Sequence, residues 1–126
     1  IKTINEKVFE GLNNLEILSL AGNKIDRIES NAFSCLINLK KLRIGYNEIN
    51  EIDSDAFNGL KNVKSIDLNR NHDISFIRNF SQFTENQTMH KIVGTKTIYT
   101  NMFNNEFLVN LEEIDLSDCN IRTIED

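Results

Sequence analysis

Long apolar runs are missing from the sequence. No stretch of about 18 consecutive apolar residues occurs among the 126 residues, so no transmembrane helix is predicted. The opening residues from Ile1 to Asn5 do not place a charged stretch before an apolar one, so they do not resemble a signal peptide. We therefore expect a signal or a membrane anchor, where the parent protein has one, outside this stretch.

Excess basic charge, proline, tryptophan and clustered cysteine are also absent. The chain has 14 Lys and Arg against 19 Asp and Glu, a net charge of −5. Because neutralised phosphates supply most of the affinity for nucleic acid, this balance argues against a nucleic-acid partner. Neither Cys35 and Cys119 nor His72 and His90 have the paired spacing of a zinc site, so we expect no metal and no cofactor.

A repeat of 24 residues fills much of the chain. In its first full copy, apolar residues and one asparagine stand at Leu15, Leu18, Leu20, Asn23, Ile25, Ile28, Phe33 and Leu36. The second copy has Leu39, Leu42, Ile44, Asn47, Ile49, Ile52, Phe57 and Leu60. The third begins with Val63, Ile66, Leu68 and Asn71, after which Ile74 comes one place late. The last has Leu111, Ile114, Leu116, Cys119, Ile121 and Ile124, and the opening Ile1, Ile4, Phe9 and Leu12 match the second half of a copy.

Each repeat position has a physical role. The L-x-x-L-x-L segment predicts a short strand whose apolar side chains point inward and whose intervening side chains face solvent. Asn23, Asn47 and Asn71 follow the strand, where a buried amide has donors and an acceptor for neighbouring turns, and Cys119 replaces Asn in the last copy. The Phe positions are expected to fill the core under the opposite side. A single copy cannot bury its apolar face, so stability must come from stacking.

With these residues, the sequence resembles the leucine-rich repeat family, in the 24-residue extracellular subclass with Phe at the nineteenth position. Toll-like receptors, neuronal adhesion proteins and insect leucine-rich immune proteins carry repeats of this kind. The chain departs from the subclass in lacking the Pro that often follows the second Ile/Leu position. The resemblance implies an α/β repeat fold: a curved, horseshoe-shaped solenoid with a parallel concave β-sheet and an irregular or short-helical convex side. It also implies an extracellular protein, secreted or exposed on a cell surface.

The repeats predict one domain fragment over 1–126, without terminal caps. Its expected parts are a partial repeat 1–14, repeats 15–38, 39–62 and 63–86, a degenerate repeat 87–110 and a partial repeat 111–126. Leu111 lies 48 residues after Val63, so a whole turn is expected between the third copy and the last. The core positions of that turn would fall on Gln87, His90 and Thr95, which are poor core residues. Sequence drift and a dedicated binding loop are both compatible with this irregular segment.

The cysteines and two sequons give further expectations. Four repeats at the spacing of paired strands separate Cys35 from Cys119 by roughly 19 Å, beyond the ~7 Å limit for a disulfide. Both are predicted to be buried thiols. The sequons at Asn79 and Asn86 lie in the irregular segment, and we expect a glycan on at least one of them.

The acidic clusters do not predict catalysis. The run Asp53-Ser54-Asp55 is interpreted as a helix N-cap before Ala56 and Phe57. The cluster of Glu112, Glu113 and Asp115 has no convergent histidine or nucleophile, so the protein is not expected to be an enzyme.

The solvent-facing strand positions form the predicted partner-binding surface on the concave side. The first turn contributes Glu16, Ile17, Ser19 and Ala21. The candidate binding residues are the basic Lys40, Lys41 and Arg43 with Tyr46, then Lys64, Asp67 and Arg70, and finally the acidic Glu112, Glu113, Asp115 and Asp118. This gradient would orient a partner of opposite polarity. Tyr46 beside Arg43 is the predicted anchor, because Tyr and Arg are enriched in binding hot spots.

A protein partner of unknown identity is therefore expected, in a receptor, adhesion or innate-immune role, and dimers through the repeat array are compatible with the pattern. Two alternatives remain open at this point. The turns are either spacers within a larger array or part of an intracellular scaffold.

Overall fold

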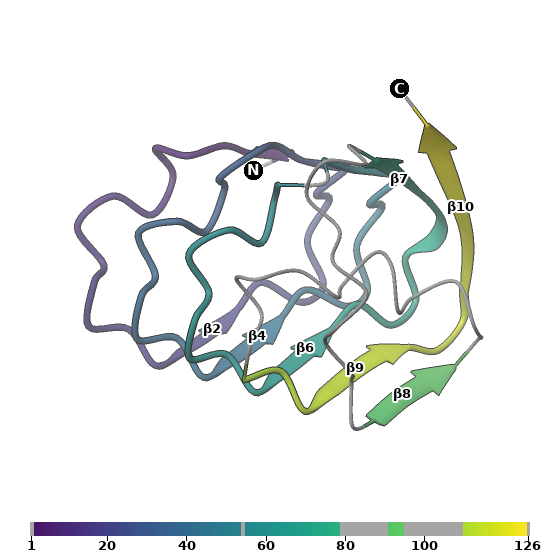
Figure 1. Cartoon of the computed structure of the whole chain (residues 1–126). Coiled ribbons are helices and arrows are strands. Elements are labelled where there is room, and N and C mark those ends of the chain that lie inside the picture. Colours follow the sequence, from purple (N-terminus) through teal and green to yellow (C-terminus); the bar gives the residue numbers. More distant parts are fainter. Residues whose placement is uncertain (1, 54, 79–90, 95–109, 126) are drawn as a thin grey trace.

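In the part of the chain that the structure describes, parallel strands form two five-stranded sheets (Figure 1). This computed structural model describes residues 2–53, 55–78, 91–94 and 110–125. The first sheet has the order β2 (Ile17–Ser19), β4 (Lys41–Arg43), β6 (Ser65–Asp67), β9 (Glu113–Leu116), β8 (Lys91–Gly94). The second sheet has the order β1 (Thr3–Ile4), β3 (Arg27–Ile28), β5 (Glu51–Asp53), β7 (His72–Arg78), β10 (Cys119–Glu125).

The 24-residue period sets the register of both sheets. In the first sheet, Leu18 is opposite Leu42, and Leu42 is opposite Ile66. In the second sheet, Ile4, Ile28 and Ile52 are aligned in the same way. The predicted repeat solenoid is confirmed, and the residues after the Asn turn form a second sheet that the sequence pattern alone did not predict.

The segments opposite the first sheet are turns at 6–11, 30–35 and 55–59, and the described residues contain no helix. Of the two predicted forms of the convex side, irregular or short-helical, the described residues show the irregular one. The N-cap interpretation of Asp53 was wrong, since there is no helix to cap. Asp53 Oδ2 instead accepts hydrogen bonds from the Ser30 backbone N–H at 3.0 Å and from the Ser30 hydroxyl at 3.4 Å, which joins two neighbouring repeats.

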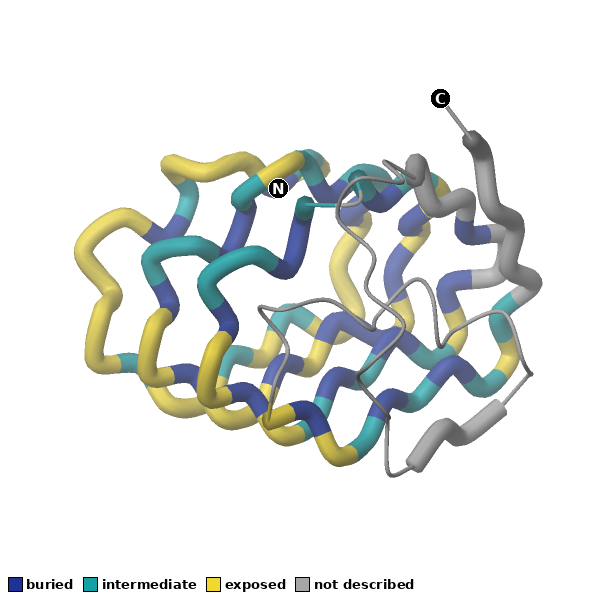
Figure 2. The backbone as a smooth tube through the Cα atoms, in the orientation of Figure 1, coloured by how far each residue is buried: buried dark blue, intermediate teal, exposed yellow. Residues whose placement is uncertain are grey.

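The core lies between the two sheets and the turns, as the dark-blue segments of Figure 2 show. The apolar repeat positions of the second and third copies are almost completely buried, including Leu39, Leu42, Ile44, Ile49, Ile52, Leu60, Val63, Ile66 and Leu68. The Phe position forms a stack. The rings of Phe9 and Phe33 are 5.8 Å apart between centroids, and those of Phe33 and Phe57 are 6.0 Å apart, both nearly parallel. The predicted role of the Phe position is confirmed.

The last repeat stacks directly on the third, contrary to the expectation of an intervening turn. β6 pairs with β9, so that Ile66 is opposite Ile114 and Asp67 is opposite Asp115. The described part of 87–110 includes β8, which pairs with the far side of β9. Ile114 and Leu116 continue the buried positions of Ile66 and Leu68, whereas the core positions expected in the intervening turn, Gln87, His90 and Thr95, are polar. Apart from β8 and Asn110, the residues of that segment lie outside the described part.

The extra residue before Ile74 is accommodated between β7 and β10. β5 and β7 keep the 24-residue register, with Ile52 opposite Phe76. On the other side of β7, Ile74 is opposite Ile121, and Cys119 is opposite His72 rather than Asn71. Ile74 is completely buried. The one-place shift seen in the sequence is thus a register change between the last two strands of the second sheet.

Buried asparagine amides connect the turns that leave the first sheet. Asn47 Oδ1 accepts a hydrogen bond from the Ile25 N–H at 3.1 Å. Its Nδ2 donates to the carbonyls of Leu20 and Ile44, each at 3.0 Å. A single side chain therefore satisfies backbone groups of its own turn and of the preceding one.

The next positions continue the ladder. Asn71 Oδ1 accepts from the Ile49 N–H at 3.1 Å, and its Nδ2 donates to Ile44 O at 3.0 Å and Leu68 O at 2.8 Å. Cys119 Sγ donates to Leu68 O at 3.1 Å in place of the amide. Burial raises the pKa of the Cys119 thiol, which keeps it protonated as this donor requires.

The two cysteines are less buried than expected. Cys35 and Cys119 are half-buried rather than fully buried, and neither forms a disulfide. Because β9 follows β6 in the first sheet, their repeats lie three strands apart instead of four. At about 4.8 Å a strand, that separation still exceeds the disulfide limit.

Replacing Asn47 with Ala should lower the free energy of unfolding by about 2–4 kcal/mol, because buried N–H and carbonyl groups lose their partners. Urea denaturation followed by circular dichroism measures this loss. Asn23→Ala is the matched control, since exposed Asn23 occupies the same repeat position but donates one bond, to Leu20 O at 2.8 Å. Its loss should stay below about 1 kcal/mol. Equal losses in the two variants would contradict the ladder.

Candidate partner-binding face

The exposed face of the first sheet results from strand alternation. On β4, Leu42 points into the core, while Lys41 and Arg43 on either side of it are exposed. The same alternation places Ser65 and Asp67 on β6 and Glu113 and Asp115 on β9 on one face. All eleven candidate binding residues lie in the described part of the chain. Eight are on these strands or directly before them, and Tyr46, Arg70 and Asp118 lie in the turns after them.

Basic side chains are concentrated on and beside β4. We define the basic patch as Lys40, Lys41, Arg43 and Lys64, all of which are exposed. Lys40 Nζ is 3.0 Å from Glu16 Oε1, an ion pair in which both side chains are more than half exposed. Lys41, Arg43 and Lys64 form no ion pair with any residue that the structure describes. Three positive charges on this face are thus available to a partner.

A second series of asparagines lies at the start of the same strands, and the sequence interpretation missed it. Asn38, Asn62 and Asn110 each donate from Nδ2 to a carbonyl of the turn stacked before them, at 2.8, 2.8 and 2.6 Å. These amides line a hollow of about 380 Å³ together with Glu16, Lys40 and Lys64. The signal was present in the sequence, because Asn directly precedes the first apolar position of each of these copies, at Leu39, Val63 and Leu111.

The acidic candidates differ in their availability. Asp67 Oδ1 accepts a hydrogen bond from the Asn69 N–H at 2.9 Å. Asp115 Oδ1 accepts from the Ser117 N–H at 2.9 Å and from its hydroxyl at 2.6 Å. Both half-buried carboxylates therefore hold the turns that follow their strands. Glu112 and Asp118 are exposed, and Glu113 is half-buried.

Tyr46, Arg70 and Asp118 form a row across three successive turns. The Arg70 guanidinium lies 5.4 Å from the centre of the Tyr46 ring, and Arg70 Nε is 3.3 Å from Asp118 Oδ2. Tyr46 was expected beside Arg43, but the cation that it contacts is Arg70, from the next repeat. Tyr46 and Arg70 also line a hollow of about 350 Å³.

The backbone of this row is unusual. Tyr46, Arg70 and Asp118 have φ angles of 53°, 54° and 56°, and the equivalent residue of the first turn is Gly22 with φ of 73°. Residues with side chains rarely adopt this left-handed conformation, which costs about 1–2 kcal/mol relative to the right-handed one. The two bulky side chains occupy a position for which glycine is best suited. Such strain is typical of residues that serve a function.

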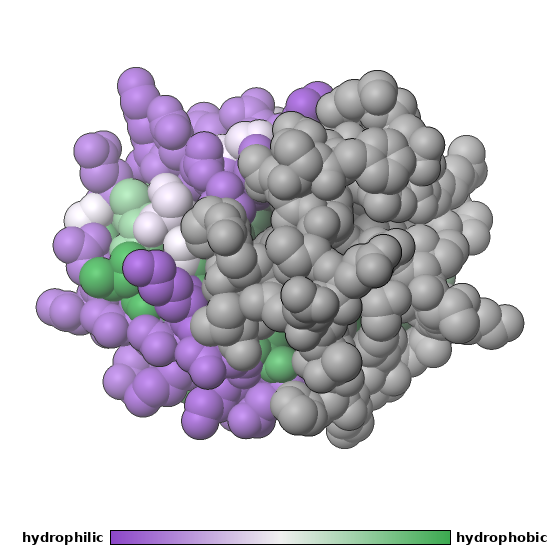
Figure 3. All heavy atoms as spheres, in the orientation of Figure 1, coloured by the Kyte–Doolittle hydropathy of each residue, from purple (hydrophilic) through white to green (hydrophobic). Residues whose placement is uncertain are grey.

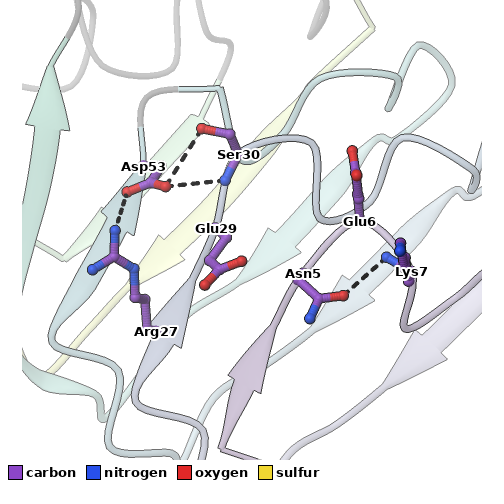
Figure 4. A pocket seen from close by; sticks show the side chains of 7 residues that line it. All are labelled: Asn5, Glu6, Lys7, Arg27, Glu29, Ser30 and Asp53. Carbon is purple, nitrogen blue, oxygen red and sulfur yellow. Dashed lines mark hydrogen bonds and ion pairs between the residues drawn. The ribbon is translucent and has the colours of Figure 1, made fainter.

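Another hollow of about 430 Å³ lies beside the second sheet (Figure 4). Arg27 extends toward the Asp53 carboxylate, which also faces Ser30. The guanidinium is 2.7 Å from Glu51 Oε2 and 3.2 Å from Asp53 Oδ1. Because the Arg27 guanidinium is already paired with two carboxylates, this hollow is less suited to a charged partner than the basic patch.

Large apolar side chains are exposed at few places. Figure 3 shows a mostly hydrophilic surface over the described part of that view, with a small apolar area. The exposed large apolar residues of the described part are Leu12, Ile17, Ile37 and Tyr46. Ile17 is opposite Lys41, so apolar area borders the basic patch. The predicted glycosylation sites, Asn79 and Asn86, lie outside the described residues.

The described residues contain no cluster of three or more His, Cys, Asp or Glu side chains able to hold a metal ion. Nor do they include a helix with the length and apolar character needed to cross a membrane.

Stacked 24-residue turns with parallel strands and an asparagine ladder define a repeat solenoid. A family model described as Leucine rich repeat matches residues 1–49 and 37–85, and a second of the same description matches residues 110–126. The chain belongs to the leucine-rich repeat family, whose repeats typically mediate contacts between proteins and are typically not enzymatic. No curated protein matches the sequence.

Replacing Tyr46 with Gly should leave the protein more stable than replacing it with Ala, by about 1 kcal/mol. Both changes remove the ring, but only glycine relieves the left-handed backbone. Urea denaturation of the two variants measures the difference. The matched pair Arg43→Gly and Arg43→Ala, within β4, should show the opposite order, since glycine weakens a strand. A less stable glycine variant at position 46 would disprove the strain.

Proposed function

We propose that this segment binds another protein through the exposed face of the first sheet, as part of a secreted or cell-surface recognition protein. Receptor, adhesion and innate-immune roles all agree with this proposal. The observation that carries it is a group of three cations, Lys41, Arg43 and Lys64, that have no ion-pair partner in the described part of the chain and lie near a tyrosine held in a strained backbone. The side chains of these residues are exposed and lie outside the buried core on which stacking depends.

The arrangement of charge supports recognition rather than simple solubility. Basic side chains are on β4 and at the start of β6, and acidic ones are on and around β9, only two strands from β4. A partner of opposite polarity would gain specificity and association rate from this pattern. The row of Tyr46, Arg70 and Asp118 adds an aromatic and charged rim, the composition typical of binding hot spots.

The second candidate is a spacer role, in which the ligand site lies elsewhere in a longer array. It is favoured by the turn-holding bonds of Asp67 and Asp115, which give two of the candidate residues a structural purpose. An intracellular scaffold is the third candidate, and dimerisation through the repeats is compatible with each of them.

Reversing Lys40, Lys41 and Arg43 to Glu should weaken partner binding at least about ten-fold, because charged interface pairs become repulsive. The measurement compares proteins retained from extracellular fluid on the immobilised chain and on the variant, quantified by mass spectrometry. These side chains are exposed, so the free energy of unfolding should change by less than about 1 kcal/mol.

The matched control reverses Lys2, Lys7 and Lys24, which are exposed residues outside the first sheet, with the same change in net charge. It should retain the partner as the unmodified chain does. Equal retention by both triple variants would favour the spacer role.

Peptide mass spectrometry of the native parent protein, with and without glycosidase, should find a glycan at Asn79 or Asn86. A glycan at either asparagine requires passage through the secretory pathway. Unmodified asparagine at both positions in protein recovered from cytosol would overturn the extracellular proposal and favour the scaffold.

A further inference from the structure

We propose that the basic patch binds a short acidic peptide segment of a protein partner, in an extended conformation along β4. This inference rests on the proposed function, because it names the partner chemistry of the same face. Lys41, Arg43 and Lys64 have no ion-pair partner among the described residues, whereas Lys40 is paired with Glu16.

The spacing of the cations fits an extended chain. Lys41 and Arg43 are two residues apart on one strand, and both are exposed on the same face. Residues at i and i+2 of a strand are about 6.6 Å apart along its axis. Side chains two residues apart in an extended partner repeat at that distance too. Carboxylates at alternating positions would therefore meet Lys41 and Arg43 together.

The borders of the basic patch limit the length of the anion. Across the sheet, the patch meets Glu16 beside β2 and Asp67, Glu113 and Asp115 on β6 and β9. A long polyanion lying across the strands would pass over these carboxylates and be repelled. A few acidic residues within an otherwise neutral or basic segment avoid that repulsion. This border favours an acidic peptide over a sulfated glycan.

Contacts beyond charge also suit a peptide. Ile17, opposite Lys41 on β2, has 53% of its surface exposed and offers apolar area for a side chain next to the carboxylates. Past the end of β4, Tyr46 is 55% exposed and lies against Arg70. The strand direction thus leads from Lys41 past Arg43 to an aromatic side chain.

Two fluorescent peptides of equal composition test the inference with the full chain. One has Glu alternating with Ser at three positions, and the other, with the same residues, has its three Glu three positions apart, so that no two of its carboxylates stand two residues apart. Fluorescence anisotropy at low salt should show the alternating peptide binding about five-fold tighter, because only its carboxylates match both cations. Raising the ionic strength should weaken this binding.

Variants localise the effect. Lys41→Gln with Arg43→Gln should reduce affinity for the alternating peptide at least about five-fold, whereas Lys2→Gln with Lys7→Gln, the same loss of charge elsewhere, should not change it. Circular dichroism checks that both variants remain folded. Equal affinity for the two peptides, equal loss in both variants, or tighter binding of a sulfated disaccharide would overturn the acidic-peptide assignment.

The acidic-peptide inference and the proposed function fail on different results. If the triple reversal of Lys40, Lys41 and Arg43 releases the natural partner but the peptides bind equally, the binding face stands and the acidic-peptide inference fails. If the alternating peptide binds selectively while retention of the natural partner is unaffected by the reversal, the proposed function fails.

Discussion

The two central turns of this solenoid each depend on one side-chain amide that satisfies backbone groups of two repeats. Leaving the first sheet, the chain must bury carbonyl and N–H groups that no strand partner reaches, and an unpaired buried group is costly. Asn47 and Asn71, the two buried polar residues of the described core, remove that cost by bonding within their own turn and to the previous one. Cys119 does this with a single thiol donor, so the last junction keeps the donor and loses the amide oxygen. The stacking distance that aligns the strands is set at these points, and so is the spacing of the side chains on the exposed face.

The sequence predicted the local parts of the structure well and the long-range parts poorly. Period and burial follow from Leu42, Ile66 and Phe33, because alternation and stacking are local consequences of the repeat. The position of 111–125 could not be obtained in this way, because counting residues assumes that turns stack in the order of the chain. In the structure the strands meet in another order, with Ile114 opposite Ile66 on one side and Ile92 on the other.

The candidate face shows the same division. Strand alternation was enough to place Lys41, Arg43 and Lys64 in solvent. The cation beside Tyr46 was misassigned, because neighbours within one strand were favoured over neighbours one repeat away. Arg70 stands 24 residues later, at the same repeat position, and stacking brings it to the ring. The sequence could not show that the carboxylates of Asp67 and Asp115 hold turns. That role depends on the hydrogen bonds that they accept from the N–H groups of Asn69 and Ser117.

The exchanged order of β9 and β8 makes this solenoid differ from one in which each turn touches only its neighbours in sequence. β6 and β9 close a loop of more than forty residues before their side chains meet, so the last turn cannot form simply by growth from the third. Closing a long loop slows folding but lowers the free energy of unfolding only slightly. The entropy lost on closure grows only with the logarithm of loop length. The pairing of β6 with β9 and of β7 with β10 is also independent of peptide continuity. If the chain is divided between residues 78 and 110, the two polypeptides together still carry β6, β7, β9 and β10. This region is therefore a natural place to divide the chain for fragment complementation.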